Sequence, residues 1–232
     1  MRKYYNLYTE GREANVQVYG EVTSYKWDDR DVTSYDLVTE LEGLDVDRIN
    51  VYINSYGGEV AEGLAIYHAL KRHPAQVRTY CDGFACSIAS VIYMAGDVRV
   101  MGEASLLMIH NASTIAAGTP AELSKAAEDL AVISSQVRQA YIDAGVTLSV
   151  DELQDMLDAE TWITPAQALE FGFATAIAKE PAIQHPTQSA RRLIFDRMSH
   201  TPEETPKIEE THTEELKENR LLNFLAEAMQ AR

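Results

Sequence analysis

Cysteine, aromatic residues and basic charge are all scarce in this 232-residue sequence, and the shortages exclude several classes of protein. The two cysteines, Cys81 and Cys86, are too few for a disulfide scaffold and have no ligand-type companions at metal spacing. We therefore expect a cytosolic protein that needs neither a metal nor another cofactor. The formal net charge of −16 argues against nucleic acid as a partner.

Long apolar runs are also missing. No stretch approaches the ~18 uninterrupted apolar residues of a membrane-spanning helix, and the first six residues lack the apolar run of a signal peptide. These features predict a cytoplasmic protein that does not interact with a membrane. With 46% hydrophobic residues, the chain nevertheless has ample aliphatic material for a globular core.

Composition divides the chain near residue 180. From Pro181 onward there are nine acidic and seven basic residues, which leaves a net charge of −14 on residues 1–180. We expect one α/β domain over residues 1–180 and a flexible acidic tail over residues 181–232. Five apolar residues near the end of this tail have the spacing of an amphipathic helix: Leu221, Leu222, Leu225, Ala228 and Met229. Such a helix either docks a partner or frays.

Apolar periodicity predicts alternating strands and helices, the pattern of an α/β fold with mainly parallel strands. Strands are expected at residues 15–20, 48–54, 77–81, 98–101, 105–109 and 173–178. Helices are expected around Leu37 and Leu41, over residues 59–72, 87–95 and 119–144, and in shorter form after Ser149 and Thr164. The helix over 87–95 is almost wholly apolar, so it should be buried, and Gly96 should close it in the C′ position.

The longest predicted helix begins at Thr119, where Thr-Pro-Ala-Glu forms a capping box with proline at the first helical position. It continues to Gly145, and about 25 residues span roughly 37 Å. A helix of this length can project from a small domain and pack against a partner subunit. The alternative is that its apolar stripe, which includes Leu123, Val137 and Tyr141, covers the sheet of its own domain.

Three segments in fixed order carry the parts of an acyl-transfer site, each where a strand ends or a helix begins. Residues 54–58 read Asn-Ser-Tyr-Gly-Gly, residues 83–87 read Gly-Phe-Ala-Cys-Ser, and residues 108–110 read Met-Ile-His. A glycine pair between a strand and a helix lets backbone N–H groups face a ligand at the positive helix end. Taken alone, such a pair also occurs in tight turns for steric reasons.

Amide hydrolysis by serine needs a base to remove its proton and a carboxylate to orient that base. Ser87 is the candidate nucleophile, although serine is also a common N-cap at the start of a helix. Cys86 is the alternative nucleophile, but buried cysteines commonly act as small hydrophobes. His110 arrives at a strand end after an apolar run and is the candidate base.

The other histidines and the acid are less sharply defined. Three of the six histidines lie in the predicted tail, and His68 and His73 lie on or just after a helix, where solvent exposure is expected. Asp158 and Glu160 are both close to Trp162, and the residues alone leave the choice between these two carboxylates open.

At these residues the chain resembles the ClpP family, the serine peptidases of the crotonase-like fold that assemble into chambered rings. The likeness spans about residues 13–180. The family's Ile-Asn-Ser-Pro-Gly-Gly segment corresponds to residues 53–58, and its Gly-x-Ala-x-Ser segment to residues 83–87. Its Met-Ile-His segment is unchanged at residues 108–110. The resemblance implies a ClpP/crotonase-like fold of repeated βαβ units with a long projecting helix.

The resemblance also implies roles for individual residues. Ser87 would be the nucleophile and His110 the general base, with the backbone amides of Gly57 and Ile88 forming the oxyanion hole. Gly58 would belong to the substrate-binding segment. The acidic position before Thr-Trp-Ile, usually aspartate in the family, is Glu160 here, with Asp158 as the alternative.

Two departures from the family pattern refine the expected setting. Tyr56 replaces the family's proline, and Ile88-Ala89 stands where Met-Gly usually follows the serine. With the extended tail, these features look more like the ClpP-related proteases of tailed phages and prophages, which act in head maturation. That likeness implies a homo-oligomeric ring, single or stacked as a double ring, that cleaves scaffold, portal or capsid polypeptides in the host cytoplasm.

Three alternatives remain at this point. The chain can be a housekeeping ClpP subunit served by a Clp-type ATPase, since it has no phosphate-binding Gly-x-x-x-x-Gly-Lys-Ser/Thr motif of its own. It can be a crotonase-type acyl-CoA enzyme, which would not need the pair Ser87 and His110. It can also be a catalytically silent structural or scaffolding protein of the same fold, against which the intact pair argues.

Overall fold

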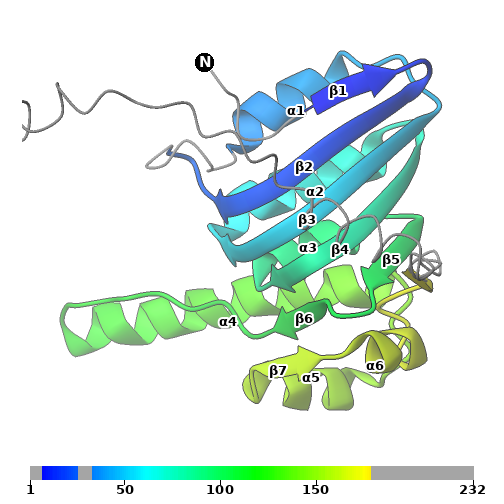
Figure 1. Ribbon diagram of the computed structural model, residues 1–232. Helices are drawn as coiled ribbons and strands as arrows, with labels where there is room; N and C mark the ends of the chain where they lie inside the picture. The colour runs from blue at the N-terminus through cyan, green and yellow to red at the C-terminus, as the bar shows by residue number, and fades with distance from the viewer. Residues whose placement is uncertain (1–6, 26–32, 179–232) are drawn as a thin grey trace, which may run out of the picture. The chain divides into compact units, whose positions relative to one another are not determined.

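The computed structural model of the chain describes residues 7–25 and 33–178. Within these ranges the strands are β1 Leu7–Glu10, β2 Glu13–Val22, β3 Arg48–Gly58, β4 Gln76–Cys86, β5 Val98–Gly102, β6 Leu106–Ile109, β7 Thr161–Ile163 and β8 Ala176–Ala178. The helices are α1 Ser34–Glu42, α2 Val60–Arg72, α3 Ile88–Tyr93, α4 Pro120–Asp143, α5 Val150–Asp158 and α6 Pro165–Glu170. This is the predicted α/β fold (Figure 1).

These strands form a single eight-stranded sheet. Its main path runs β1-β2-β3-β4-β5-β8, and β6 pairs with β4 at one end and carries β7 on its other side. Four neighbouring pairs on this path are parallel, namely β2–β3, β3–β4, β4–β5 and β5–β8. The pair β4–β6 is also parallel. In Figure 1, α1, α2 and α3 lie behind this sheet. The prediction of mainly parallel strands is confirmed.

Alternating apolar residues fix which face of the central strands is covered. On β3, Ile49, Val51 and Ile53 are fully buried, and in the parallel register Val51 lies between Val16 of β2 and Thr79 of β4. Burying such side chains against helices contributes roughly 1.5–3 kcal/mol each. Both β3 and β4 extend beyond the strands predicted from periodicity, through Gly58 and Cys86 respectively. These extensions are the segments that carry the motif residues.

Two short antiparallel strands were not predicted. Leu7–Glu10 pairs with β2 as β1, and Thr161–Ile163 pairs with β6 as β7. The strand predicted over residues 173–178 is confirmed only for Ala176–Ala178. A strand of three or four residues shows too little alternation to be recognised, because its position is set by its partner strand rather than by its own sequence.

Helix α3 is buried on all sides, as its apolar sequence predicts, but its predicted end is wrong. All six residues from Ile88 to Tyr93 are buried, and the helix ends with Met94 as its C-cap rather than with Gly96. Gly96 has another role: a Cβ at this position would lie 2.4 Å from the Thr79 hydroxyl and 2.9 Å from the Val98 carbonyl oxygen. It is therefore a close-approach glycine and not a helix cap.

The capping box at Thr119 is confirmed, and α4 is a 24-residue helix. Its buried residues are confined to the C-terminal part, namely Val137, Ala140 and Tyr141. Leu123, by contrast, is 43% exposed and Val132 63% exposed. In Figure 1 the N-terminal part of α4 extends past the strands. The helix therefore projects, and the alternative that its whole apolar stripe covers its own sheet is wrong.

The tail boundary near residue 180 and the amphipathic helix proposed for its end concern residues outside the described ranges and stay predictions. Among the helices in the described ranges, none has the length and apolar character needed to cross a membrane.

Candidate active site

Ser87 and His110 lie in hydrogen-bond contact, with 2.7 Å between Ser87 Oγ and His110 Nε2. They are brought together by the parallel pair β4 and β6, in which Cys86 is opposite Met108. Beyond the ladder, the Ser87 backbone N–H donates to the Met108 carbonyl at 2.8 Å. Both side chains are half-buried. The ends of two neighbouring strands thus hold a serine hydroxyl and an imidazole at the separation that proton transfer requires.

Ser87 occupies a left-handed backbone conformation, with φ of 53° and ψ of −129°. Such a conformation is costly for a residue with a side chain, and it often marks a functional turn. Ser87 occupies the N-cap position of α3, as expected, but its side chain makes no capping hydrogen bond, so capping does not account for the hydroxyl. The hydroxyl is instead directed to His110.

Cys86, the alternative nucleophile, is fully buried. Burial raises the pKa of its thiol to about 11, so the thiol stays protonated near neutral pH. The thiolate is the nucleophilic form of cysteine. This environment favours a packing role for Cys86 and leaves the adjacent Ser87 as the better nucleophile.

Gly57 packs directly against the Ser87 turn. A Cβ at Gly57 would lie 2.7 Å from Ser87 Cβ and 2.8 Å from the Cys86 carbonyl oxygen, and its φ is +102°. Only glycine fits this position. The Gly57 N–H donates to Ser55 Oγ at 3.0 Å, and Ser55 Oγ donates to the Gly20 carbonyl at 2.5 Å. The amide expected in the oxyanion hole is thus close to the nucleophile but engaged by Ser55.

The other two backbone positions expected at the site lie on either side of Gly57. Ile88 begins α3, and its backbone nitrogen is 3.2 Å from the place where a Gly57 Cβ would be. Gly58, with φ of +145°, faces β2 instead, because a Cβ there would lie 2.0 Å from the Val22 carbonyl oxygen. The Ile88 backbone nitrogen is therefore close to Gly57, whereas Gly58 packs against the neighbouring strand.

Neither candidate carboxylate contacts His110 among the described residues. Glu160 follows α5 with a left-handed φ of 50° and is exposed. The antiparallel register of β6 and β7 ends with the pair Ile109 and Thr161, and a continuation by one residue would set His110 opposite Glu160. Asp158 is two residues earlier and accepts a hydrogen bond from Asn111 Nδ2 at 2.6 Å. The structure brings the serine and the histidine together, and leaves both acids within the adjoining turn.

Hydrogen bonds at two places near the site were not predicted from the sequence. The Ser90 and Tyr141 hydroxyls are 2.8 Å apart in the buried contact between α3 and α4, and Ser90 Oγ also donates to the Ser87 carbonyl at 2.5 Å. Asn111, the residue after His110, binds Asp158. Asn111 could have been recognised in the sequence as an amide side chain directly after the proposed base. Nothing in the sequence indicates that the Tyr141 hydroxyl forms a buried hydrogen bond.

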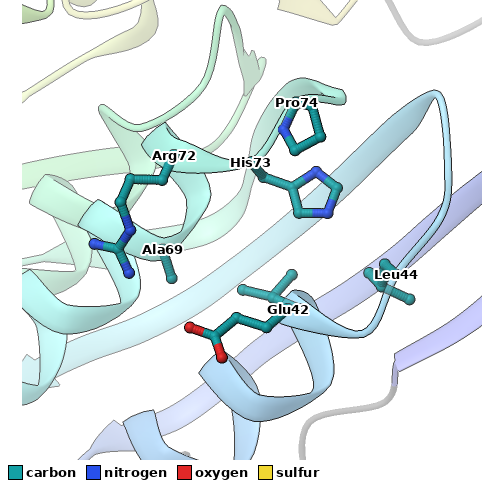
Figure 2. A pocket seen from close by; sticks show the side chains of 7 residues that line it. Glu42, Leu44, Ala69, Arg72, His73 and Pro74 are labelled. Carbon is teal, nitrogen blue, oxygen red and sulfur yellow. The ribbon is translucent and has the colours of Figure 1, made fainter.

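The remaining described histidines lie elsewhere. His68 is exposed as expected, whereas His73 is half-buried and accepts the Ala75 N–H at Nδ1, 3.1 Å away. His73 lines an open pocket of about 240 Å³ between the ends of α1 and α2. Figure 2 shows Glu42, Arg72 and His73 among its side chains. Arg72 ends the 13-residue helix α2, which is about 20 Å long and begins at Val60, so the pocket lies at the end of α2 away from Gly57 and Gly58.

Within residues 7–25 and 33–178, no three His, Cys, Asp or Glu side chains are grouped so that they could hold a metal ion.

Comparison with known families agrees with this geometry. The family model described as Clp protease matches residues 4–181. The chain belongs to the Clp protease family. The ATP-dependent Clp protease proteolytic subunit 1 of Corynebacterium jeikeium is 33% identical over 128 residues, covering 54% of this chain and 67% of the relative. The ATP-dependent Clp protease proteolytic subunit 3 of Rhodococcus jostii is 31% identical over 147 residues, which cover 62% of this chain and 72% of that relative.

A solved structure shares the fold of this Clp protease family member. A point mutant of ClpP1 from Listeria monocytogenes superposes with a TM-score of 0.62 over 72% of this chain and 92% of that chain, at 22% sequence identity. The family consists of serine endopeptidases that form ring oligomers, and this chain is an enzyme of that class. The expected ClpP-like fold and serine-type endopeptidase are confirmed.

Proposed function

We propose that this protein hydrolyses peptide bonds with Ser87 as nucleophile, His110 as general base and Glu160 as the orienting acid. The observation that carries the proposal is the 2.7 Å contact between Ser87 Oγ and His110 Nε2. It is made by a serine in a left-handed turn whose hydroxyl is not used as a helix cap. No other described histidine lies beside that turn.

In the proposed reaction His110 Nε2 accepts the Ser87 hydroxyl proton as Oγ attacks the scissile carbonyl carbon. The carbonyl oxygen becomes an oxyanion held by the amides of Gly57 and Ile88. The protonated imidazole then donates that proton to the departing amine, which leaves an acyl-enzyme on Ser87. A water molecule, deprotonated by His110, hydrolyses this ester and regenerates the free serine.

Glu160 is the preferred third member because the β6–β7 register, continued one residue beyond its last pair of Ile109 and Thr161, would set it opposite His110. A carboxylate there would accept the Nδ1–H of the imidazole, fix its tautomer and stabilise the imidazolium. Glutamate carries one methylene more than the aspartate usual in the family, so it reaches further from the exposed turn.

The oxyanion hole requires one adjustment. The Gly57 N–H donates to Ser55 Oγ at 3.0 Å, so it must turn toward or be shared with the substrate oxygen. An oxyanion is a stronger acceptor than a hydroxyl, because hydrogen bonds to ionised groups are roughly twice as strong as neutral ones. The donor can therefore move from Ser55 to the oxyanion as charge develops.

For the biological setting we propose a homo-oligomeric ring that matures the head of a tailed phage, cleaving scaffold, portal or capsid polypeptides in the host cytoplasm. Support comes from Tyr56 in place of the family's proline, from Ile88-Ala89 after the serine, and from 51 residues that follow the family match at residue 181. The projecting, largely exposed α4 offers a surface for subunit contacts.

A second setting has its own support. The similar relatives are named proteolytic subunits of ATP-dependent Clp proteases, which favours a housekeeping subunit served by a Clp-type ATPase. The two settings differ in what must be added for cleavage. A head protease should cut capsid, portal or scaffold polypeptides when it is co-expressed with them alone, whereas a housekeeping subunit should degrade casein only with an unfoldase and ATP.

The test compares wild type with Ser87→Ala in both assays. Ser87-dependent trimming of co-expressed head polypeptides, without an unfoldase, supports the phage setting. Casein degradation that needs both an unfoldase and ATP supports the housekeeping setting and contradicts the phage one. Correct assembly with no cleavage in either assay would favour a structural role for the fold.

A further inference from the structure

Beside His110, four polar side chains from three parts of the chain form one hydrogen-bonded network. Asp158 Oδ1, at the end of α5, accepts Asn111 Nδ2 at 2.6 Å and Gln154 Nε2 at 2.6 Å. Gln154 Nε2 also donates to Asn111 Oδ1 at 3.4 Å, which closes a triangle. Arg138 of α4 donates to Gln154 Oε1.

The orientation of each amide in this network is determined by Arg138. A guanidinium can only donate, so Gln154 must present its oxygen to Arg138 and its NH₂ group to the other side. That NH₂ group meets Asp158 and Asn111 Oδ1, which leaves the Asn111 NH₂ group to face Asp158. Asp158 Oδ1 therefore accepts a hydrogen bond from each of two amides.

The partners of Asp158 distinguish it from the proposed catalytic acid, because the hydrogen bonds of its carboxylate are made with Asn111 and Gln154 and not with His110. Asn111 directly follows His110, and Asp158 is two residues before Glu160. The Asn111–Asp158 bond thus joins the segment that carries the base to the turn that carries the acid, across 47 residues of sequence. A second tie acts on the same segment, because the Ala112 N–H donates to Ser134 Oγ of α4 at 3.0 Å.

We propose that Asn111 and Asp158 are positioning residues: their hydrogen bond, oriented by Gln154 and Arg138, holds the Glu160 turn in register with His110. Asp158 then acts through the geometry of the turn and never touches substrate or the imidazole. The inference rests on the proposed roles of Ser87, His110 and Glu160. It adds a reason why an exposed turn can place a carboxylate reproducibly: small misplacements of catalytic groups cost up to a hundredfold in rate.

The experiment measures labelling of Ser87 in the full-length protein by a fluorophosphonate, with the rate constant kinact and the constant KI determined separately. Asn111→Ala and Asp158→Ala remove the bond and should lower kinact about 10- to 100-fold, with KI within twofold of wild type. Asp158→Asn keeps an acceptor oxygen, so its kinact should stay within threefold. The midpoint of its kinact–pH profile should be unchanged, because residue 158 does not contact the imidazole.

The reciprocal exchange is the sharpest variant. Asn111→Asp alone opposes two carboxylates and should lower kinact as much as Asn111→Ala. Combined with Asp158→Asn it restores a donor and an acceptor between positions 111 and 158 in reverse order, and Gln154 Nε2 keeps an acceptor oxygen at position 111, so kinact should rise well above that of Asn111→Asp alone. Such recovery is a readout that general destabilisation does not produce.

Several outcomes would overturn the inference. A loss of about 1,000-fold or more in Asp158→Asn, unrelieved by the exchange, would make Asp158 the triad acid itself. Unchanged kinact in both alanine variants would leave the network without a role, and losses matched by an equal loss of folded protein in circular dichroism would make it merely structural. Failure of wild type to label at Ser87 is a different result, since it removes the proposed function and the inference with it.

Discussion

The proposed nucleophile and base directly follow fully buried strand residues, whereas the candidate acids lie at the exposed end of α5 and in the turn after it. Ala85, Cys86 and Ile109, which precede Ser87 and His110, are fully buried. Asp158, Ala159 and Glu160 are all exposed. The sheet alone therefore fixes the distance between Ser87 and His110, while the acid depends on a three-residue strand and a few surface hydrogen bonds. The serine and histidine are therefore held more rigidly than the candidate acids.

The same contrast runs along α4. Its C-terminal part is anchored in the core by Val137, Ala140 and Tyr141, and its N-terminal part is exposed. Removing interactions at the anchored end should therefore change the stability of the whole fold. Removing interactions at the projecting end should change only local order.

Glu160→Gln tests the exposed half of the site and has the largest expected effect. The amide cannot stabilise the imidazolium, so kcat/KM should fall about 10³- to 10⁴-fold while the fold is retained. Peptidase assays with Glu103→Gln, another exposed glutamate, as the matched control measure this. If Glu160→Gln stays within threefold of wild type, Glu160 is not the acid.

Gly57→Ala tests the buried half, with Gly145→Ala as its control. Both glycines have a positive φ, +102° at Gly57 and +91° at Gly145. A Cβ at Gly57 would collide with the Ser87 turn, whereas a Cβ at Gly145 would have no atom within 4 Å. Alanine keeps the backbone N–H but its Cβ would displace both that N–H and the Ser87 turn, so we expect Gly57→Ala to lower kcat/KM at least about 100-fold, as much as removal of an oxyanion donor. Gly145→Ala should lose stability through backbone strain and keep its activity within about twofold. Equal activity losses would mean that strain alone is responsible.

Tyr141→Phe tests the anchored end of α4. Burial raises the pKa of Tyr141, so the phenol stays protonated and can share a hydrogen bond with Ser90. Losing it should lower the free energy of unfolding by about 1 kcal/mol. Urea unfolding should show no comparable change for Tyr35→Phe, whose ring is 79% exposed. Equal effects in both variants would contradict a special role for the buried pair.

Two helix caps compare a buried and an exposed helix with the smallest expected effects. Ser149 caps α5, which buries Leu153 and Leu157, so Ser149→Ala should lower the free energy of unfolding by about 1 kcal/mol. Thr119 makes the same capping box at the exposed start of α4. Thr119→Ala should only increase local amide hydrogen exchange there. A global loss in Thr119→Ala as large as in Ser149→Ala would show that the projecting end belongs to the cooperative core.

Much of the sheet was predictable because its residues alternate. The apolar residues Ile49, Val51 and Ile53 mark β3, and the apolar run before His110 marks β6. The serine, histidine and glycine motifs could be placed because each ends or begins such an element. The capping boxes at Thr119, Ser149 and Thr164 were equally predictable, because each depends on residues only three positions apart.

The parts that the sequence did not reveal depend on partners distant in the chain. β7 is three residues long and exists through its pairing with β6. The Asn111–Asp158 bond joins surface side chains 47 residues apart, for which no periodicity exists. The left-handed backbone at Ser87 and Glu160 is imposed by surrounding structure on residues that do not favour it. Ser55 likewise gave no sign that it would engage the Gly57 amide.

Intact-mass spectrometry after fluorophosphonate treatment tests the central claim most directly, on wild type and Ser87→Ala, with native mass spectrometry of the same samples to establish assembly. A base-activated serine should give one adduct per wild-type chain and none on Ser87→Ala. An assembled wild-type oligomer without an adduct, or a Ser87→Ala variant labelled as fully as wild type, would contradict the assignment of Ser87 and His110 as a catalytic pair.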